Sequence, residues 1–151
     1  MSYPNITDPE NHIWYKTNIG DVPELTLRDN LCIELVTKRE VEVIQSAIDL
    51  FNSEISWDGM FDVEEAIDRI DNGERFYVLH EEGKILGYIW IKKDSYYYNF
   101  FVTQNRTKGD SQAFLSKVLH GTVVEDFNFW VARENVRALA FFDKMGFKRT
   151  K

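Results

Sequence analysis

A basic turn at Arg106–Ser111, with Gly109 near its centre, is the segment of this sequence best suited to bind a ligand. It follows a stretch typical of a strand, Tyr96–Thr103, and precedes an amphipathic stretch typical of a helix, Gln112–His120. Where a helix begins after such a turn, several backbone N–H groups lack partners and point in one direction. Together with the positive end of the helix dipole, they predict a site for a phosphate-bearing ligand. The alternative is an ordinary connecting loop in which Asp110 caps the helix.

Periodic apolar residues predict the elements that position this turn. Strands are expected at Leu31–Val36, Arg75–His80, Lys84–Lys93, Tyr96–Thr103, Asp126–Ala132 and Phe147–Lys151. Helices are expected after the capping box Thr37–Glu40, between Asp62 and Gly73, and over Gln112–His120 and Asn135–Met145. The order β-α-α-β-β-β-α-β-α-β predicts a mixed α/β domain over residues 31–151, in which helices flank a central, mostly antiparallel sheet. Residues 1–30 are expected to form an irregular, polar extension.

The bulk composition fits one folded domain of 151 residues, 44% of them hydrophobic. A net charge of −7 argues against a nucleic-acid partner. The apolar runs are too short to span a membrane, and the N-terminus lacks a secretory signal, so no membrane partner is expected. One cysteine, Cys32, excludes an internal disulfide and is expected to be buried, so we expect a cytoplasmic protein. His12, His80 and His120 are too scattered for a metal site.

The charges are separated along the chain. Residues Glu40–Glu82 contain 13 acidic side chains against only Arg69 and Arg75, a net charge of −11. Residues Gln104–Lys151 contain 9 basic and 5 acidic side chains, a net charge of +4. Solvated helix faces account for many of the acidic residues. The separation nevertheless predicts one region that meets anions and another that meets cations.

Two motifs together resemble the GNAT superfamily of N-acetyltransferases. The turn has the pattern Arg106-x-x-Gly109-x-Ser111, and the family's turn is usually Q/R-x-x-G-x-G/A. The segment Asn135–Phe147 is similar to the family's last helix, N-x-x-A-x-x-x-Y-x-K-x-G-F. A short glycine pattern alone recurs by chance, but the two motifs at this spacing are more specific. The resemblance covers roughly residues 31–151 and implies acetyl-CoA as the acyl donor, with no metal.

The resemblance also implies which residues hold the coenzyme. In this family the strand before the turn splays away from the next strand, so that its peptide groups bind the pantetheine arm, and the amides of the turn bind the pyrophosphate. Asn135 would reach the thioester end, or would only cap its helix. The implied cofactor-binding residues are Phe101, Val102, Thr103, Arg106, Thr107, Lys108, Gly109, Asp110, Ser111 and Asn135.

Acyl transfer of this type requires a base that deprotonates the amine and a donor that stabilises the oxyanion. A backbone N–H near Val102 is the candidate oxyanion donor. Asp58, in the loop between the first two helices, and Tyr98 are the candidate catalytic residues, and Glu54 lies in the same acceptor region. Deprotonation through water is an equal alternative, because the strand Tyr96–Thr103 contains no carboxylate.

Three features depart from the family pattern. Phe142 stands where the family often has its tyrosine acid, and it cannot donate a proton. Asp110 would repel phosphate although it favours the helix dipole. The chain stops four residues after Phe147, so the last strand is short, and residues 1–30 or a second subunit in a homodimer would cover the sheet edge.

These patterns support three hypotheses. The first is an acetyl-CoA-dependent N-acetyltransferase that acts on a primary amine, either a cationic small molecule or a peptide. The second is a non-catalytic acyl-CoA-binding or interaction module on the same fold, favoured by Phe142 and Asp110. The third is a general α/β interaction domain without a coenzyme site.

Overall fold

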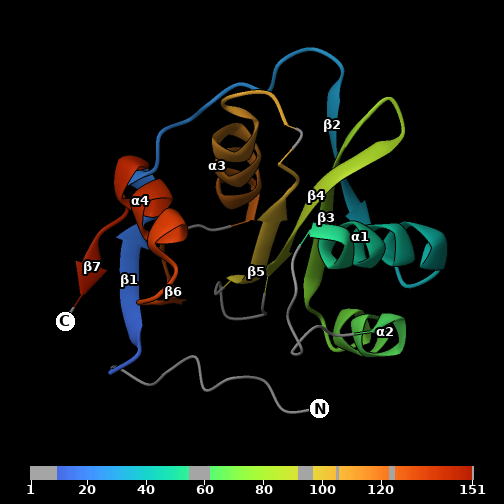
Figure 1. Cartoon of the computed structure of the whole chain (residues 1–151), viewed down its shortest axis with the longest axis horizontal. Helices are drawn as coiled ribbons and strands as arrows, with labels where there is room; N and C mark the ends of the chain where they lie inside the picture. Colours follow the sequence, from blue (N-terminus) through green and yellow to red (C-terminus); the bar gives the residue numbers. More distant parts are fainter. Residues whose placement is uncertain (1–9, 55–61, 92–96, 105, 123–124, 151) are drawn as a thin grey trace.

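The computed structural model describes residues 10–54, 62–91, 97–104, 106–122 and 125–150 (Figure 1). The first half of the described chain contains β1 (His12–Asn18), the 3-10 helix η1 (Ile19–Asp21), β2 (Leu31–Val36), α1 (Val41–Glu54), α2 (Val63–Asp71), β3 (Arg75–Glu81) and β4 (Lys84–Ile91). The second half contains β5 (Tyr97–Val102), α3 (Asp110–Thr122), β6 (Asp126–Ala132), α4 (Val136–Lys144) and β7 (Arg149–Thr150). The predicted mixed α/β class is confirmed.

The strands form two antiparallel sheets rather than one. The four-stranded sheet has the order β2-β3-β4-β5, and the three-stranded sheet has the order β6-β1-β7. In Figure 1 the β1 side of the molecule, with α4, stands apart from the β2–β5 side, with α1 and α2, and α3 lies between them. The sheet therefore divides between β5 and β6.

Two apolar clusters hold the layers together. One packs α1 and α2 against β2–β5, and it includes the predicted stripe of Ile44, Ala47, Ile48 and Phe51. The other joins α3 and α4 to both sheets, and it includes the predicted stripe of Phe114, Leu115, Val118 and Leu119. Cys32 is exposed on β2, so the expectation that it is buried is wrong. Its side chain belongs to an edge strand of the four-stranded sheet.

The expectation of an irregular region through residue 30 is wrong over β1. This strand is the central strand of its sheet, and it pairs with β6 from His12↔Ala132 to Asn18↔Asp126. It also pairs with the short β7, at Trp14↔Thr150 and Tyr15↔Arg149. Part of residues 1–30 therefore pairs with both β6 and the short last strand, and coverage of the remaining sheet edge by a second subunit stays a prediction.

The ends of the helices follow local sequence. Asp62 caps α2 by accepting a hydrogen bond from the Glu65 amide at 2.9 Å, and Gly73 follows α2 with φ +92°. Positive φ is a conformation that glycine adopts readily and other residues rarely adopt. Before α1, Glu40 accepts from the Thr37 amide at 2.9 Å, which is one half of the predicted capping box. Within the described residues, no helix combines the length and apolar character needed to cross a bilayer.

Candidate acyl-donor site

The separation between β5 and β6 is the first feature of the candidate site. Strand β5 hydrogen-bonds to β4 on one side, and β6 hydrogen-bonds to β1, so these two neighbours in the chain order share no ladder. We call this separation the splay. It leaves one edge of β5 without a partner strand among the described residues. The splay has the form that the family resemblance implied.

Strand register shows which peptide groups face the splay. The Thr103 amide donates to the Leu86 carbonyl at 2.7 Å, so the Thr103 peptide faces β4. Residues along a strand point their N–H and C=O groups to alternate sides. Val102 therefore directs its N–H away from β4, and no acceptor for that N–H is found in the described part of the chain. This position suits the predicted oxyanion or pantetheine donor.

The same alternation applies to two other predicted residues, Phe101 and Thr103, whose binding of the pantetheine arm stays a prediction. Phe101 and Thr103 direct their peptide groups toward β4, so their amides do not face the splay. Phe100, which the sequence did not single out, lies opposite Ile89 and directs its peptide away from β4, as Val102 does. A strand predicted from the sequence implies that its peptide groups alternate between two sides. Which of them face β4 is known only once the register is known.

The two predicted catalytic residues stay predictions. Asp58 lies outside the described residues. Tyr98 belongs to β5, where the register passes from Trp90↔Asn99 to Ile91↔Tyr97 and leaves Tyr98 as the additional residue.

The turn after β5 leads directly into a helix, as the sequence predicted. Gly109 adopts φ +94°, which disfavours other residues, and a Cβ placed there would meet open space. Helix α3 begins immediately afterwards, at Asp110. The amides of Lys108, Gly109 and Ser111 have no acceptor among the described residues. They are the donors that this turn can offer to an anion.

Two amides of the turn, those of Thr107 and Asp110, have acceptors within the turn itself, and their predicted contact with the coenzyme stays a prediction. The Thr107 amide donates to Asp110 Oδ2 at 3.1 Å, and the Asp110 amide donates to the Thr107 carbonyl at 3.1 Å. Arg106 reaches back to β5 and donates from Nη1 to the Thr103 carbonyl at 3.0 Å. The turn is thus tied to itself and to the strand before it.

Asp110 does not stand as an unpaired charge at the helix N-terminus. Its side chain is 3% exposed and lies 3.0 Å from Arg28 Nε, measured from Oδ1. The predicted repulsion of phosphate is therefore offset by a partner that sequence reasoning missed. No local pattern around Arg28 signals this contact, because its partner is 82 residues away.

Glu54, at the end of α1, is attached to the end of β5. Its carboxylate accepts hydrogen bonds from the Thr103 hydroxyl and from the Gln104 amide, the latter at 2.8 Å. Both carboxylate oxygens are therefore engaged. Glu54 is placed to fix α1 against the strand that borders the splay.

The motif on α4 contributes a cap and a core residue. Asn135 caps the helix by accepting from the Ala138 amide at 3.1 Å, so the capping alternative is confirmed, and its contact with a ligand stays a prediction. Phe142 is buried, with its ring 4.8 Å from that of Phe129. The neighbouring Phe141 packs against Phe100 of β5 at 5.6 Å. Within the described residues, no group of three metal-binding side chains is assembled.

Residues 45–151, more than half of the chain, match the family model of the acetyltransferase (GNAT) domain. The chain therefore belongs to the GNAT family of acetyltransferases. No curated protein matches it by sequence.

Solved structures share the fold at low sequence identity. An aminoglycoside acetyltransferase from an uncultured soil metagenomic sample superposes with a TM-score of 0.60 and 18% identity, over 80% of this chain and 90% of that one. A GCN5-related N-acetyltransferase from Ralstonia eutropha JMP134 superposes with a TM-score of 0.56 and 17% identity, over 80% of this chain and 94% of that one. At these identities, the likeness shows the fold alone.

Two longer proteins also superpose. A functionally unknown conserved protein from Staphylococcus epidermidis ATCC 12228 gives a TM-score of 0.70 at 12% identity, over 92% of this chain and 57% of that one. A Drosophila protein gives a TM-score of 0.68 at 11% identity, over 93% of this chain and 48% of that one. This chain thus spans about half the length of these two structures.

Proposed function

We propose that this protein is an acetyl-CoA-dependent N-acetyltransferase that acts on a primary amine. Membership of the GNAT family supports acyl transfer. The observation that carries the proposal is the presence of two kinds of donor for which the described part of the chain offers no acceptor. The Val102 N–H borders the splay, and the amides of Lys108, Gly109 and Ser111 stand at the N-terminus of α3, where β5 ends. An acyl donor with a thioester arm and a diphosphate at the far end of that arm would suit both kinds of donor.

The chemistry proposed for this site is direct transfer. A neutral amine attacks the thioester carbon, and the carbonyl becomes an oxyanion that accepts a hydrogen bond from Val102 N–H. The carbon–sulfur bond then breaks, and the electron pair leaves on the coenzyme thiolate. A thiol with a pKa of about 8.5 leaves without a protein acid, so the transfer does not require a hydroxyl at Phe142. Water or Asp58 takes the proton from the amine.

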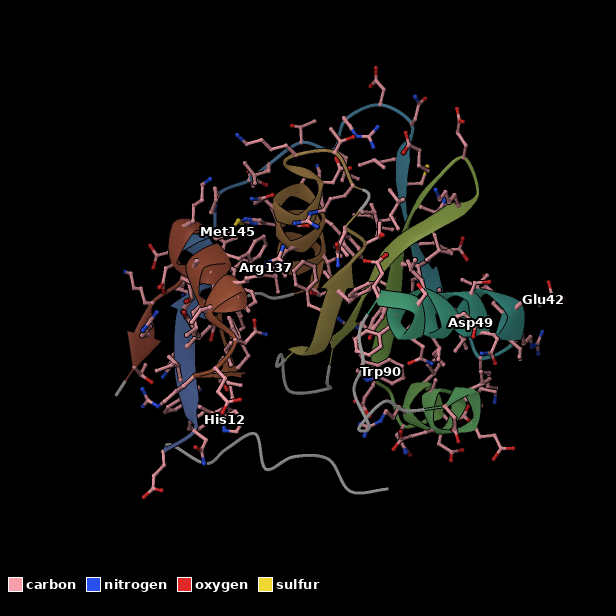
Figure 2. The ribbon with its side chains drawn as sticks, in the orientation of Figure 1. His12, Glu42, Asp49, Trp90, Arg137 and Met145 are labelled. Carbon is pink, nitrogen blue, oxygen red and sulfur yellow. The ribbon has the colours of Figure 1, made fainter. Side chains whose placement is uncertain are left out.

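The proposed acceptor is cationic, either a small molecule or a peptide. Helices α1 and α2 expose carboxylates, among them Glu42, Asp49, Glu64 and Asp68. Figure 2 shows Glu42 and Asp49 on α1, on the opposite side of the molecule from Arg137 of α4. Such a field raises the local concentration of a cation. The aminoglycoside acetyltransferase that shares the fold has also been seen in complex with sisomicin.

Coenzyme binding is the first test of the proposal. A ligand that binds only the native state stabilises it by about 2.7 kcal/mol at 100-fold over its Kd. CoA and acetyl-CoA should therefore raise the melting temperature, whereas adenosine should not. Release of free thiol from acetyl-CoA, measured with and without a panel of primary amines, then tests turnover. Absence of any coenzyme-induced shift would refute the proposal.

A non-catalytic acyl-CoA-binding module is the second candidate, because Phe142 supplies no acid. It predicts the same coenzyme-induced stabilisation, but no amine in the panel would accelerate the release of thiol. The two candidates therefore differ in the second measurement and agree in the first.

A further inference from the structure

An extended segment, Val22–Arg28, follows the whole length of α3, and we call it the strap. His120 Nε2, in the last turns of α3, lies 2.8 Å from the Val22 carbonyl oxygen. In the middle of the helix, Ser116 Oγ donates to the Pro23 carbonyl at 2.6 Å and accepts from the Leu25 amide at 3.0 Å. The strap therefore runs from the end of α3 toward its beginning. Its last residue, Arg28, arrives at the turn that precedes the helix.

Arg28 joins three parts of the fold. Its Nε and Nη2 donate to the two oxygens of Asp110, at 3.0 and 3.1 Å. Its Nη1 and Nη2 donate to the two oxygens of Glu81, at the end of β3, at 2.9 and 3.1 Å. The guanidinium thus makes a two-pronged contact with each carboxylate, a geometry that lysine cannot reproduce.

The contact matters for the turn because Asp110 is buried. Its carboxylate is 3% exposed, and a buried charge needs a partner. Arg28 is that partner, and Asp110 Oδ2 in turn accepts from the Thr107 amide at 3.1 Å. This chain of contacts fixes the peptide on one side of Gly109 while the helix fixes the other. The amides of Lys108, Gly109 and Ser111 then have one orientation.

We propose that Arg28 is a positioning residue for the diphosphate of the acyl donor: it holds Asp110, Asp110 holds the Thr107 amide, and the turn so held presents its remaining amides to the ligand. This inference rests on the proposed function. Arg28 is assigned no direct contact with the phosphates, because four of the five N–H donors of its guanidinium are directed to the two carboxylates. Its effect is confined to the part of the coenzyme that the turn binds.

The decisive experiment compares two ligands in two matched variants. CoA carries the diphosphate, and pantetheine keeps the thiol arm but lacks it. Arg28→Lys should raise the Kd for CoA about tenfold, the effect of losing one charge-assisted hydrogen bond, and should change the Kd for pantetheine less than about twofold. Arg149→Lys makes the same substitution in another forked contact, with Asp143, and should change neither Kd. Titration calorimetry on the folded wild-type protein and on both variants measures the Kd of each for the two ligands.

Three results would overturn the positioning role while leaving the proposed function intact. These are an unchanged Kd for CoA in Arg28→Lys, an equal loss for CoA and pantetheine, and a tenfold loss in Arg149→Lys as well. Failure of the wild-type protein to bind CoA would instead overturn the proposed function, and the positioning role with it. If Arg28→Lys does not fold, Glu81→Gln replaces it, because that change leaves the contact with Asp110 in place. Glu81→Gln should raise the Kd for CoA about threefold and leave the Kd for pantetheine unchanged. An unchanged Kd for CoA would overturn the positioning role.

Discussion

Gly87 of β4 lies so close to the backbone of Phe101 in β5 that no side chain on Gly87 would fit between the two strands. A Cβ on Gly87 would lie 2.3 Å from the Phe101 carbonyl oxygen and 2.8 Å from Val102 Cα. Both nearest atoms belong to the backbone, which cannot rotate away. Glycine at this position therefore allows β5 to approach β4 fully and keeps the strand that borders the splay in register.

We expect Gly87→Ala to lower the free energy of unfolding by about 2–3 kcal/mol, because the backbone of one strand must shift. Chemical denaturation measures the change. Gly121→Ala is the matched control, since a Cβ there meets nothing within 4 Å and the residue lies in α3. Alanine in a helix should stabilise by about 0.5–1 kcal/mol. Equal effects of the two substitutions would contradict the close approach.

Glu54 and Thr103 should be energetically coupled, because the contact joins α1 to the buried end of β5. A double-mutant cycle with Glu54→Gln and Thr103→Val should give a coupling energy of about 1–3 kcal/mol in denaturant unfolding. The exposed hydrogen bond between Gln45 and Asp49 on α1, at 2.8 Å, provides a comparison. A cycle on that pair should give no more than about 0.5 kcal/mol. Additive effects of the first pair would show that Glu54 does not fix the strand.

Local sequence was sufficient to predict much of the fold. The apolar stripes of α1 and α3 follow from helical periodicity. Asp62 precedes α2 as its cap and Gly73 follows it, as their side-chain and backbone chemistry indicates. Strand β1 was missed because its alternation is short and lies within a region flanked by prolines. Its stability comes from pairing with β6 more than 100 residues later, which no local pattern shows.

The candidate site also has features that local sequence predicted and features that it did not. The turn around Gly109 was predicted because it lies between a strand-like and a helix-like segment, and in the structure Gly109 has a positive φ. The partner of Asp110 was not predicted, since a contact between Arg28 and a helix 82 residues away depends on the path of the strap. Which peptides of β5 face the splay depends on register, so Val102 could be separated from Thr103 only in the structure.

The hydroxyl of Tyr15 should make stability fall at alkaline pH. Tyr15 is fully buried, and its hydroxyl donates to Asp143 Oδ1 at 2.9 Å. Burial, reinforced by the hydrogen bond to Asp143, raises the pKa of Tyr15 to about 12. The folded protein thus keeps a proton that the unfolded chain loses near pH 10. The stabilisation is complete below pH 10 and is lost as the pH rises toward 12.

Tyr15→Phe isolates this effect. At neutral pH the substitution should cost about 1–2 kcal/mol, because it leaves the Asp143 carboxylate without one donor. Denaturant unfolding of both proteins from pH 8 to pH 12 should show the difference shrinking above pH 10. A difference that stays constant across this range would show that Tyr15 titrates alike in the folded and unfolded chains.

The loss of stability caused by a tyrosine on α4 should depend on which of two adjacent phenylalanines is replaced. Phe142 is 4% exposed, and its ring lies near those of Tyr15, Phe129 and Phe147. A hydroxyl added there enters an aromatic cluster and should cost about 1–3 kcal/mol of stability. Phe141 is only partly buried and packs against Phe100 of β5, so Phe141→Tyr should cost less than about 1 kcal/mol. Thermal and denaturant unfolding of both variants measure this contrast.

The same pair of variants tests whether the missing hydroxyl limits turnover. If the thiolate leaves unprotonated, neither variant should raise the rate of amine-dependent thiol release from acetyl-CoA by more than about twofold. A tenfold increase in Phe142→Tyr would correspond to about 1.4 kcal/mol of transition-state stabilisation. It would show that the ring points its para position toward the sulfur, and that a general acid at Phe142 is the part of the family's machinery that this chain lacks.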